Sequence, residues 1–268
     1  KGKGIQSLYQ HLDPLMEYRP AFINATYHRS EHVFKKNADG SFQKVIVRKR
    51  PGTESICAAI MNKYSVDTVP HLICGGFGIN ETEDALINLH YLGIDNVLVL
   101  RGDAAKNENA FLPEPGGHKY ATELLKQVVD LNSGIYLEED LKNTSKTKFC
   151  IGVAGYPEKH FEAPNMESDL HYLKQKVDMG AEYIVTQMFF DNEKFYAFVK
   201  ACREHGITVP IIPGLKPIYS INQLTLLPKV FHIDIPKELS KEIINCKTEE
   251  AVEQVGAEWL LYQSQELK

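Results

Sequence analysis

Residues 167–213 read ESDLHYLKQKVDMGAEYIVTQMFFDNEKFYAFVKACREHGITVPIIP, and this stretch decides the fold class. A helical pattern over Glu167–Gly180 stops at glycine and is followed by the β-rich run Tyr183–Gln187. The same order then repeats, with a helical pattern over Glu193–Gly206 and a β-rich run over Val209–Pro213. Successive helix–glycine–strand units are typical of an α/β fold with parallel strands.

Further β-rich runs extend this rhythm toward the N-terminus: Ala21–Thr26, Val69–Cys74, Asn96–Leu100 and Phe149–Val153. Their apolar character is nearly continuous, which indicates strands covered on both faces, as in a parallel sheet. Another helix is expected over Asn80–Gly93, with Asn80 as its N-cap and Glu83 in the capping-box position. Its buried stripe would consist of Ala85, Leu86, Leu89 and Leu92.

Six strands with helices between them predict a (β/α)8 TIM barrel whose first and last strands lie outside the chain. Helical patterns at Ile5–Met16 and Glu249–Lys268 leave no strand visible at either end. Such a gap would expose two strand edges, so we expect the natural chain to extend past both ends. We expect a single catalytic domain over residues 1–268, with a hairpin-like insertion at about 28–52 around the turn composition of Asn37–Gly40.

Composition narrows the class of protein. The 268 residues are 43% hydrophobic, which suits one barrel of roughly 250 residues. A net charge of -5 argues against a nucleic-acid partner, and no apolar run reaches the roughly 20 residues of a membrane span. The five scattered cysteines indicate reduced thiols in a cytoplasmic protein, and no zinc-ligand spacing occurs. We expect a homo-oligomer, for which an exposed Trp259 on the last helix would offer a contact.

The active site of a β/α barrel lies at the carboxyl ends of its strands, so the residues that close each strand carry the functional signal. The strand Asn96–Leu100 ends in Arg101, Gly102 and Asp103, a cation, a glycine and a carboxylate. This combination suits a polar ligand, because glycine lets a ring or phosphate approach the backbone closely. A salt bridge beside a turn glycine is the alternative.

The strand Phe149–Val153 continues into a turn that carries Tyr156 and His160, a stacking ring and a hydrogen-bond donor. A solvated turn explains them equally well. On the next helix Asp169, Tyr172 and Lys176 share one face. They suit the sugar, base and phosphates of a nucleotide, although an ordinary solvated face is the simpler interpretation of the pattern alone.

Three other strands give weaker signals. Gln187 is followed by two phenylalanines, which suits either a flat heterocycle or core packing. Thr26 and Tyr27 place a hydroxyl and a ring after the first strand, whereas His71 inside a buried strand is more often a satisfied core residue. The cluster Gly75–Gly78 lacks the lysine of a phosphate loop and is interpreted as an ordinary glycine-rich loop.

Taken together, these strand ends resemble one family. The matching segments, in order, are Thr26-Tyr27, Pro70-His71-Leu72, Leu100–Asp103, Tyr120-Ala121, Ala154–Glu158 with His160, Thr186–Asp191 and Ile211–Pro217. The chain is similar over nearly its whole length to methylenetetrahydrofolate reductases, which are FAD-dependent TIM barrels.

The resemblance implies a role for each strand-end residue. Thr26 would lie near the flavin and the nicotinamide, and the flavin with its ribityl chain would contact Tyr27, His71, Arg101, Gly102, Asp103 and Ala121. The adenosine and pyrophosphate would be held by Tyr156, His160, Ala163, Asp169, Tyr172, Gln175 and Lys176. Gln187 and Gln223 would contact the folate, and Gln187 also the nicotinamide. No metal is implied.

The family's reaction is a ping-pong hydride transfer. NADH or NADPH reduces FAD, and 5,10-methylenetetrahydrofolate then takes the hydride to become 5-methyltetrahydrofolate, which feeds methionine synthesis. By resemblance Asp103 and Gln187 are the catalytic candidates, with Asp103 favouring cationic character in the substrate. The family's general acid is a glutamate on its first strand, which would precede Lys1.

The chain departs from the family pattern at several positions. Tyr172 and Gln175 stand where asparagine and arginine are common, and His28-Arg29 replace a glycine or alanine loop. Two other functions therefore stay open. One is a non-catalytic flavin- or folate-binding barrel, and the other is a phosphate-sugar aldolase or isomerase with Lys216 as its Schiff-base lysine.

Overall fold

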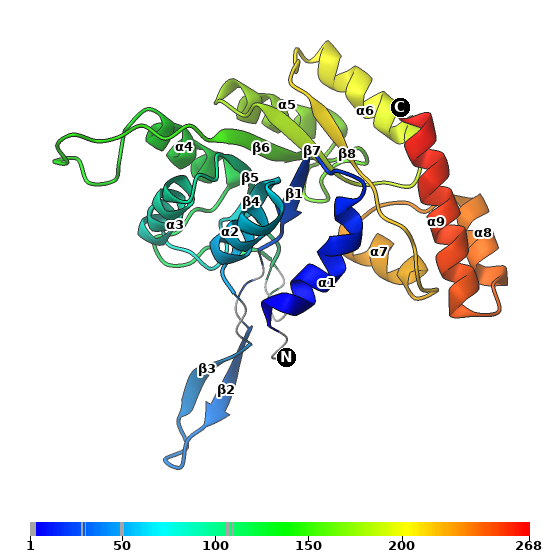
Figure 1. Ribbon diagram of the computed structural model, residues 1–268, viewed down its shortest axis with the longest axis horizontal. Coiled ribbons are helices and arrows are strands. Elements are labelled where there is room, and N and C mark those ends of the chain that lie inside the picture. The colour runs from blue at the N-terminus through cyan, green and yellow to red at the C-terminus, as the bar shows by residue number, and fades with distance from the viewer. Residues whose placement is uncertain (1–3, 28, 30, 49–50, 105–107, 109) are drawn as a thin grey trace. The chain divides into compact units, whose positions relative to one another are not determined.

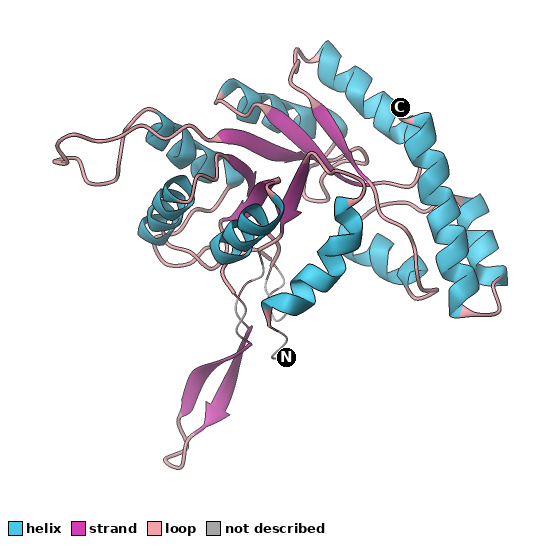
Figure 2. Cartoon of the chain, in the orientation of Figure 1, coloured by secondary structure: helices cyan, strands magenta, loops and turns pink. Residues whose placement is uncertain are grey.

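The computed structural model describes residues 4–27, 29, 31–48, 51–104, 108 and 110–268. The chain divides into two compact units, residues 1–151 and residues 152–268, and the division falls inside strand β6 (Cys150–Gly155). In each unit parallel strands alternate with helices, as Figures 1 and 2 show. The α/β class with parallel strands is therefore confirmed.

Unit 1 is built from β/α repeats. Its elements are α1 (Ile5–Met16), β1 (Phe22–Ala25), β2 (Glu31–Lys36), β3 (Phe42–Arg48), α2 (Thr53–Tyr64), β4 (Asp67–Ile73), α3 (Ile79–Tyr91), β5 (Asn96–Leu100) and α4 (Ala121–Asn132). Strand β4 lies between β1 and β5 and is parallel to both. The N–H of Cys150 donates to Asp95 O at 2.7 Å, so β6 begins beside the start of β5. Strands β1, β4 and β5 therefore end on the same edge of their sheet.

The insertion forms the expected hairpin. Strands β2 and β3 are antiparallel and pair in a separate two-stranded sheet. The turn is closed by the N–H of Asn37, which donates to Ser41 O at 2.8 Å, and by Asp39, whose carboxylate accepts from the N–H of Ser41 at 2.9 Å. His28 and Lys49, near the limits of the predicted insertion, lie outside the described residues.

Unit 2 continues the same alternation. It contains the rest of β6, α5 (Met166–Asp178), β7 (Tyr183–Met188), α6 (Asn192–Glu204), β8 (Ile211–Gly214), α7 (Gln223–Phe231), α8 (Lys237–Asn245) and α9 (Glu249–Glu266). Strand β7 is parallel to both β6 and β8. Helices α5 and α6 stop where predicted, because Gly180 (φ 121°) and Gly206 (φ 73°) adopt positive φ angles that other residues avoid.

A second group of apolar residues lies under the C-terminal helices. Phe190, Ile218, Leu227, Leu239 and Ile243 are buried together in unit 2. Trp259 packs against them and its Nε1 donates to Phe190 O at 3.0 Å. The prediction that Trp259 is exposed is therefore wrong, because the indole both fills this core and satisfies its N–H inside it.

The start of α3 also differs from the prediction. The helix begins at Ile79, so Gly78 rather than Asn80 is the N-cap, and the carboxylate of Glu81 accepts from the N–H of Gly78 at 2.7 Å. Glu83 instead accepts from the N–H of Leu137 at 2.8 Å. Ala85, Leu86 and Leu89 are buried as expected, whereas Leu92 is 46% exposed because it lies at the C-cap, beyond the packed face.

Three further observations concern the whole of the described chain. All five cysteines are free thiols. None of the helices in the described ranges combines the length and apolarity needed to cross a membrane. The described side chains include no group of three or more His, Cys, Asp or Glu residues arranged to hold a metal ion.

Candidate functional site

The carboxyl end of β1 presents Thr26 and Tyr27. Thr26 is exposed, whereas the half-buried ring of Tyr27 lies 4.9 Å from the ring of Phe77, at an angle of 52°. Burial raises the pKa of the Tyr27 hydroxyl, and the nearby Glu54 carboxylate raises it further. Tyr27 is therefore a neutral hydrogen-bonding group at this strand end.

His71 lies on β4 with an unsatisfied ring nitrogen. Its Nε2 is buried and makes no hydrogen bond within the described residues. Burial lowers the pKa of His71 to about 4, so the imidazole is neutral at pH 7. The interpretation of His71 as a satisfied core residue is therefore wrong, and an orphaned buried polar atom of this kind calls for a ligand or an ordered water.

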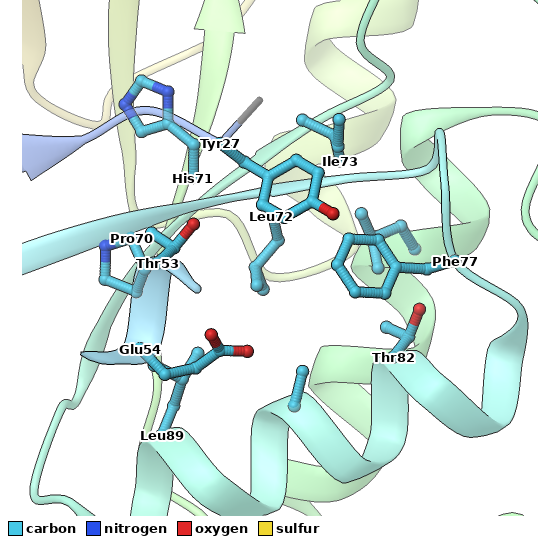
Figure 3. A pocket seen from close by; sticks show the side chains of 12 residues that line it. Tyr27, Thr53, Glu54, Pro70, His71, Leu72, Ile73, Phe77, Thr82 and Leu89 are labelled. Carbon is cyan, nitrogen blue, oxygen red and sulfur yellow. The ribbon is translucent and has the colours of Figure 1, made fainter. Parts of the chain in front are cut away.

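A small pocket lies beside β4 and is lined by residues of that strand, His71 among them, and of helices α2 and α3. Figure 3 shows Leu72 pointing into it and the ring of His71 pointing away, because neighbouring residues of a strand face opposite sides. The carboxylate of Glu54 extends into the pocket from α2. Its free volume of about 20 Å³ suits water and is far below that of a cofactor site.

The end of β5 carries three of the predicted flavin contacts. The Arg101 guanidinium lies 5.3 Å from the centre of the Phe111 ring, and Asp103 is exposed. Gly102 has φ +84°, and a Cβ there would lie 3.3 Å from Cβ of Ile73, so a side chain at this position would be strained and crowded. Ala121, the remaining predicted contact of unit 1, is the half-buried first residue of α4.

Arg29 joins the loops that follow β1, β4 and β5, and the sequence did not single it out as a site residue. Its guanidinium forms a 2.9 Å ion pair with Glu114 and lies 4.0 Å from the carboxylate of Glu108. A Cβ at Gly75 would be 3.1 Å from the Arg29 side chain, so the glycine makes room for the arginine. The only sequence signal was that His28-Arg29 replaces a small-residue loop, together with the glycines at 75 and 76.

In unit 2 the loop after β6 holds a series of rings. Tyr156 meets His160 edge-on at 4.7 Å, His160 stacks on Phe161 at 4.9 Å, and Phe161 stacks on His232 at 4.6 Å. The loop is fixed at its base by Asp169, whose carboxylate accepts from the N–H of His160 at 2.8 Å. Tyr156 and His160 therefore have a defined arrangement, and the alternative of a freely solvated turn does not describe them.

The predicted site residues on helix α5 differ in burial: the Lys176 ammonium is buried, whereas Tyr172 and Gln175 are exposed. The Lys176 ammonium donates to Ala154 O at 3.1 Å, and burial lowers the pKa of Lys176 to about 8, partly offset by the charge of Asp169. A solvated face is therefore the wrong description for Lys176. Tyr172 and Gln175 are exposed and contact His171, the ring of Tyr172 at 5.8 Å and the amide of Gln175 at 3.2 Å.

Ala163 lies in the same loop as the rings. Its N–H donates to His160 O at 3.0 Å, and its carbonyl accepts from the Lys159 ammonium at 2.6 Å. Lys159 itself has φ +76°, a backbone conformation that a non-glycine residue adopts only when its surroundings enforce it. The loop between β6 and α5 is thus built to one shape.

The predicted folate contacts of unit 2 differ in burial. Gln187 is half-buried at the end of β7, and its carbonyl oxygen accepts from the N–H of Met188 at 3.0 Å. Gln223 is only 5% exposed at the start of α7, and its carbonyl oxygen accepts from the N–H of Tyr219 at 2.9 Å. Phe189 and Phe190 are both buried, so they belong to the core rather than to a binding surface.

Lys216, which follows β8, is the lysine that would form the Schiff base in the aldolase alternative. Its ammonium lies 4.7 Å above the ring of Tyr219, which is 51% exposed. A lysine that forms a Schiff base needs surroundings that favour its neutral form, whereas a cation–π contact favours the charged form. The local geometry therefore gives the aldolase reading no support.

Comparison with known protein families and sequences points to one family. The family model described as methylenetetrahydrofolate reductase matches residues 1–268. Methylenetetrahydrofolate reductase 2 of Saccharomyces cerevisiae is 33% identical over 99% of this chain and 40% of that protein. The 5,10-methylenetetrahydrofolate reductase of Salmonella typhimurium is 32% identical over 88% of this chain and 67% of that protein.

A solved structure supports the fold. A protein from Clostridium thermocellum, described as binding two copies of 5-methyl-5,6,7,8-tetrahydrofolic acid, covers 100% of this chain and 79% of its own, with a TM-score of 0.56 and 14% identity. At that identity the likeness concerns the fold alone. The chain spans about 40% of the length of the yeast relative.

Proposed function

Because the chain belongs to the methylenetetrahydrofolate reductase family, we propose that it reduces 5,10-methylenetetrahydrofolate to 5-methyltetrahydrofolate with NADH or NADPH, through bound FAD. The observation that carries this proposal is the family match over residues 1–268, which includes every strand end discussed above. The product would feed methionine synthesis.

The residues of unit 1 fit a flavin ring. The buried Nε2 of His71 lacks a partner among the described residues, and at Gly102 a side chain would be strained and would crowd Ile73, so only glycine keeps the backbone accessible there. We assign Thr26, Tyr27, His71, Arg101, Gly102, Asp103 and Ala121 to the ring and its ribityl chain. When bound, FAD supplies a ring that takes a hydride from the nicotinamide and gives it to the folate.

The residues of unit 2 fit the rest of the cofactor. A buried ammonium with a lowered pKa gains from a phosphate partner, because an anion offsets the cost of keeping Lys176 charged. Tyr156 and His160 offer ring faces and polar atoms to an adenosine, and Asp169 holds their loop. We assign Tyr156, His160, Ala163, Asp169, Tyr172, Gln175 and Lys176 to the adenosine and pyrophosphate.

Three residues are assigned to the folate. Asp103 is exposed and carries the negative charge that favours cationic character in the substrate, while Gln187 and Gln223 offer amides that both donate and accept. The family match supports the substrate class. Asp103 and Gln187 would therefore act on the reacting groups, and Gln223 would bind substrate.

The setting of the enzyme is part of the proposal. Free thiols at all five cysteines agree with a cytoplasmic protein. We also propose that the chain self-associates into a homo-oligomer.

The test is a pair of half-reactions on the purified protein. We expect FAD to copurify or to bind when added, NADH or NADPH to be oxidised with an artificial electron acceptor, and methylenetetrahydrofolate to replace that acceptor. Oxidation of the nicotinamide without any folate reduction would favour the non-catalytic alternative. A protein that neither holds FAD nor oxidises either nucleotide would overturn the proposal.

A further inference from the structure

The last helix of unit 2 contacts both loops that lead to the proposed folate amides. Helix α9, labelled in Figure 1, buries Val252, Gly256 and Gln263 against the rest of this unit. Trp259 lies on the same side of the helix, because positions 252, 256, 259 and 263 recur every three or four residues. We call Gly256, Trp259 and Gln263 the docking stripe.

Two residues of the docking stripe hold the backbone that follows Gln187. The Trp259 Nε1 donates to Phe190 O at 3.0 Å, and the amide nitrogen of Gln263 donates to Phe189 O at 3.3 Å. Phe189 is only two residues beyond Gln187. Helix α9 therefore restrains the direction of the chain where β7 ends and Gln187 is presented.

Gln263 makes this contact at a cost in free energy. The residue is only 1% exposed, and its Oε1 has no hydrogen-bond partner among the described residues. Its Nε2 also donates to Asn192 Oδ1 at 3.1 Å, and Asn192 Nδ2 donates to Gln263 O at 3.2 Å. An unpaired buried oxygen is unfavourable, so the amide at this position is explained by the backbone that its nitrogen holds.

The third residue of the docking stripe lets α9 approach the loop after β8. A Cβ at Gly256 would lie 1.8 Å from Ile218 O and 2.8 Å from Ile218 C, so the helix and the loop are in direct backbone contact. The next residue, Tyr219, donates its N–H to the side-chain oxygen of Gln223 at 2.9 Å. Gly256 therefore sets the distance between α9 and the loop that orients Gln223.

We propose that α9 positions both folate amides, so that Gly256, Trp259 and Gln263 are positioning residues for the substrate. This inference rests on the proposed function, because it takes Gln187 and Gln223 as folate contacts. One helix ties the two loops together, so a shift of α9 moves both amides at once. A misplacement of about 1 Å is enough to weaken binding and slow a reaction.

The variant Gly256→Ala tests the close approach directly. Alanine is a better helix former than glycine, so α9 should stay helical while the new methyl group pushes it away from Ile218. We expect the affinity for 5-methyltetrahydrofolate, measured by equilibrium dialysis, to fall at least about fivefold. The KM for methylenetetrahydrofolate should rise by a larger factor than any change in NADH oxidation with an artificial acceptor.

The emission of Trp259 reports whether the helix has moved. Trp259 is the single tryptophan of the 268 residues, so the tryptophan emission comes from the docking stripe alone. In the FAD-loaded protein, Gly256→Ala and Gln263→Met should shift the emission to longer wavelength and increase its quenching by acrylamide, because a displaced indole meets water. Gln263→Met should also lower the affinity for 5-methyltetrahydrofolate, since it removes the bond to Phe189 O.

A matched control separates the position of α9 from its stability. Ala257 is exposed beside Gly256, so Ala257→Gly weakens the helix without touching either loop. It should lower the thermal unfolding temperature and leave both the folate affinity and the Trp259 emission unchanged. The inference is overturned if Gly256→Ala binds 5-methyltetrahydrofolate as wild type does, or if Ala257→Gly loses as much affinity.

Failure of the proposed function gives a different result. Wild type would then bind 5-methyltetrahydrofolate without reducing methylenetetrahydrofolate, and the affinities of Gly256→Ala and Ala257→Gly would still decide the role of α9. A wild type that binds no 5-methyltetrahydrofolate would overturn both proposals.

Discussion

The buried Nε2 of His71 on β4 is the clearest sign of a ligand site among the individual residues. The pattern of a buried strand predicted that His71 would be satisfied within the core, yet its Nε2 has no hydrogen-bond partner among the described residues. The sequence marks a strand as buried, but it does not tell which side chain atoms find a partner across the sheet. That depends on neighbours brought together by the fold.

His71 should make the FAD-free protein sensitive to mild acid. Its folded pKa of about 4 lies below the ordinary 6.5, so the unfolded chain binds the proton more readily between these values. Stability is therefore fully present above pH 6.5 and falls as the pH drops toward 4, by up to about 3 kcal/mol. Urea unfolding at pH 7 and pH 5 should show a larger loss for wild type than for His71→Asn. Equal losses would contradict the assignment.

Asp103 should affect the two half-reactions differently. Replacing this exposed carboxylate with asparagine removes a negative charge from the proposed flavin site, which should raise the flavin potential. Asp103→Asn should slow methylenetetrahydrofolate reduction more than NADH oxidation, as measured by rapid mixing of each half-reaction. A uniform slowing of both would show that Asp103 acts only in binding.

Helices and strands were the features best predicted from the sequence. The observed strand limits lie within two residues of those expected, as for β5 (Asn96–Leu100), because continuous apolar runs flanked by glycine identify buried strands. The start of α3 was misplaced, since an extended glycine at 78 serves as N-cap and leaves no side-chain signal. The inward position of Trp259 was missed because it depends on a carbonyl 69 residues away.

Lys176 on α5 should couple FAD binding to pH. Its pKa of about 8 means that the ammonium loses its proton as the pH rises from 7 to 9, and a phosphate prefers the charged form. FAD affinity should fall over that range, and Lys176→Met should weaken binding about tenfold at pH 7 and remove the pH dependence. Lys174→Met is the matched control, because Lys174 pairs with Asp178 on the same helix. Identical behaviour of the two variants in FAD titrations would rule out the role.

The ion pair between Arg29 and Glu114 should position the loop that carries Asp103. The pair joins the end of β1 to the segment between β5 and α4. Arg29→Gln and Glu114→Gln should each lower the turnover of NADH by up to about fivefold, the range of a partly exposed pair. The double variant should be no worse than either single variant, with FAD content unchanged. Fully additive losses would mean that the two residues act separately.

At the scale of the whole molecule, the order of the strand-end motifs along the chain identified the family better than any one motif did. A single segment such as Arg101–Asp103 did not identify the family, whereas the succession of such segments did. The family model spans the same residues. The strand-end residues fall in both compact units, the flavin-ring set in unit 1 and the nucleotide set in unit 2. The proposed assignment therefore names residues of each unit separately.

The visible absorption spectrum of the purified protein, before and after anaerobic addition of NADH or NADPH, tests the central claim most directly. A flavoprotein reductase should show the flavin bands at about one FAD per chain, and they should bleach when the nucleotide is added. A colourless protein that takes up no added FAD, or flavin bands that neither nucleotide bleaches, would contradict the account.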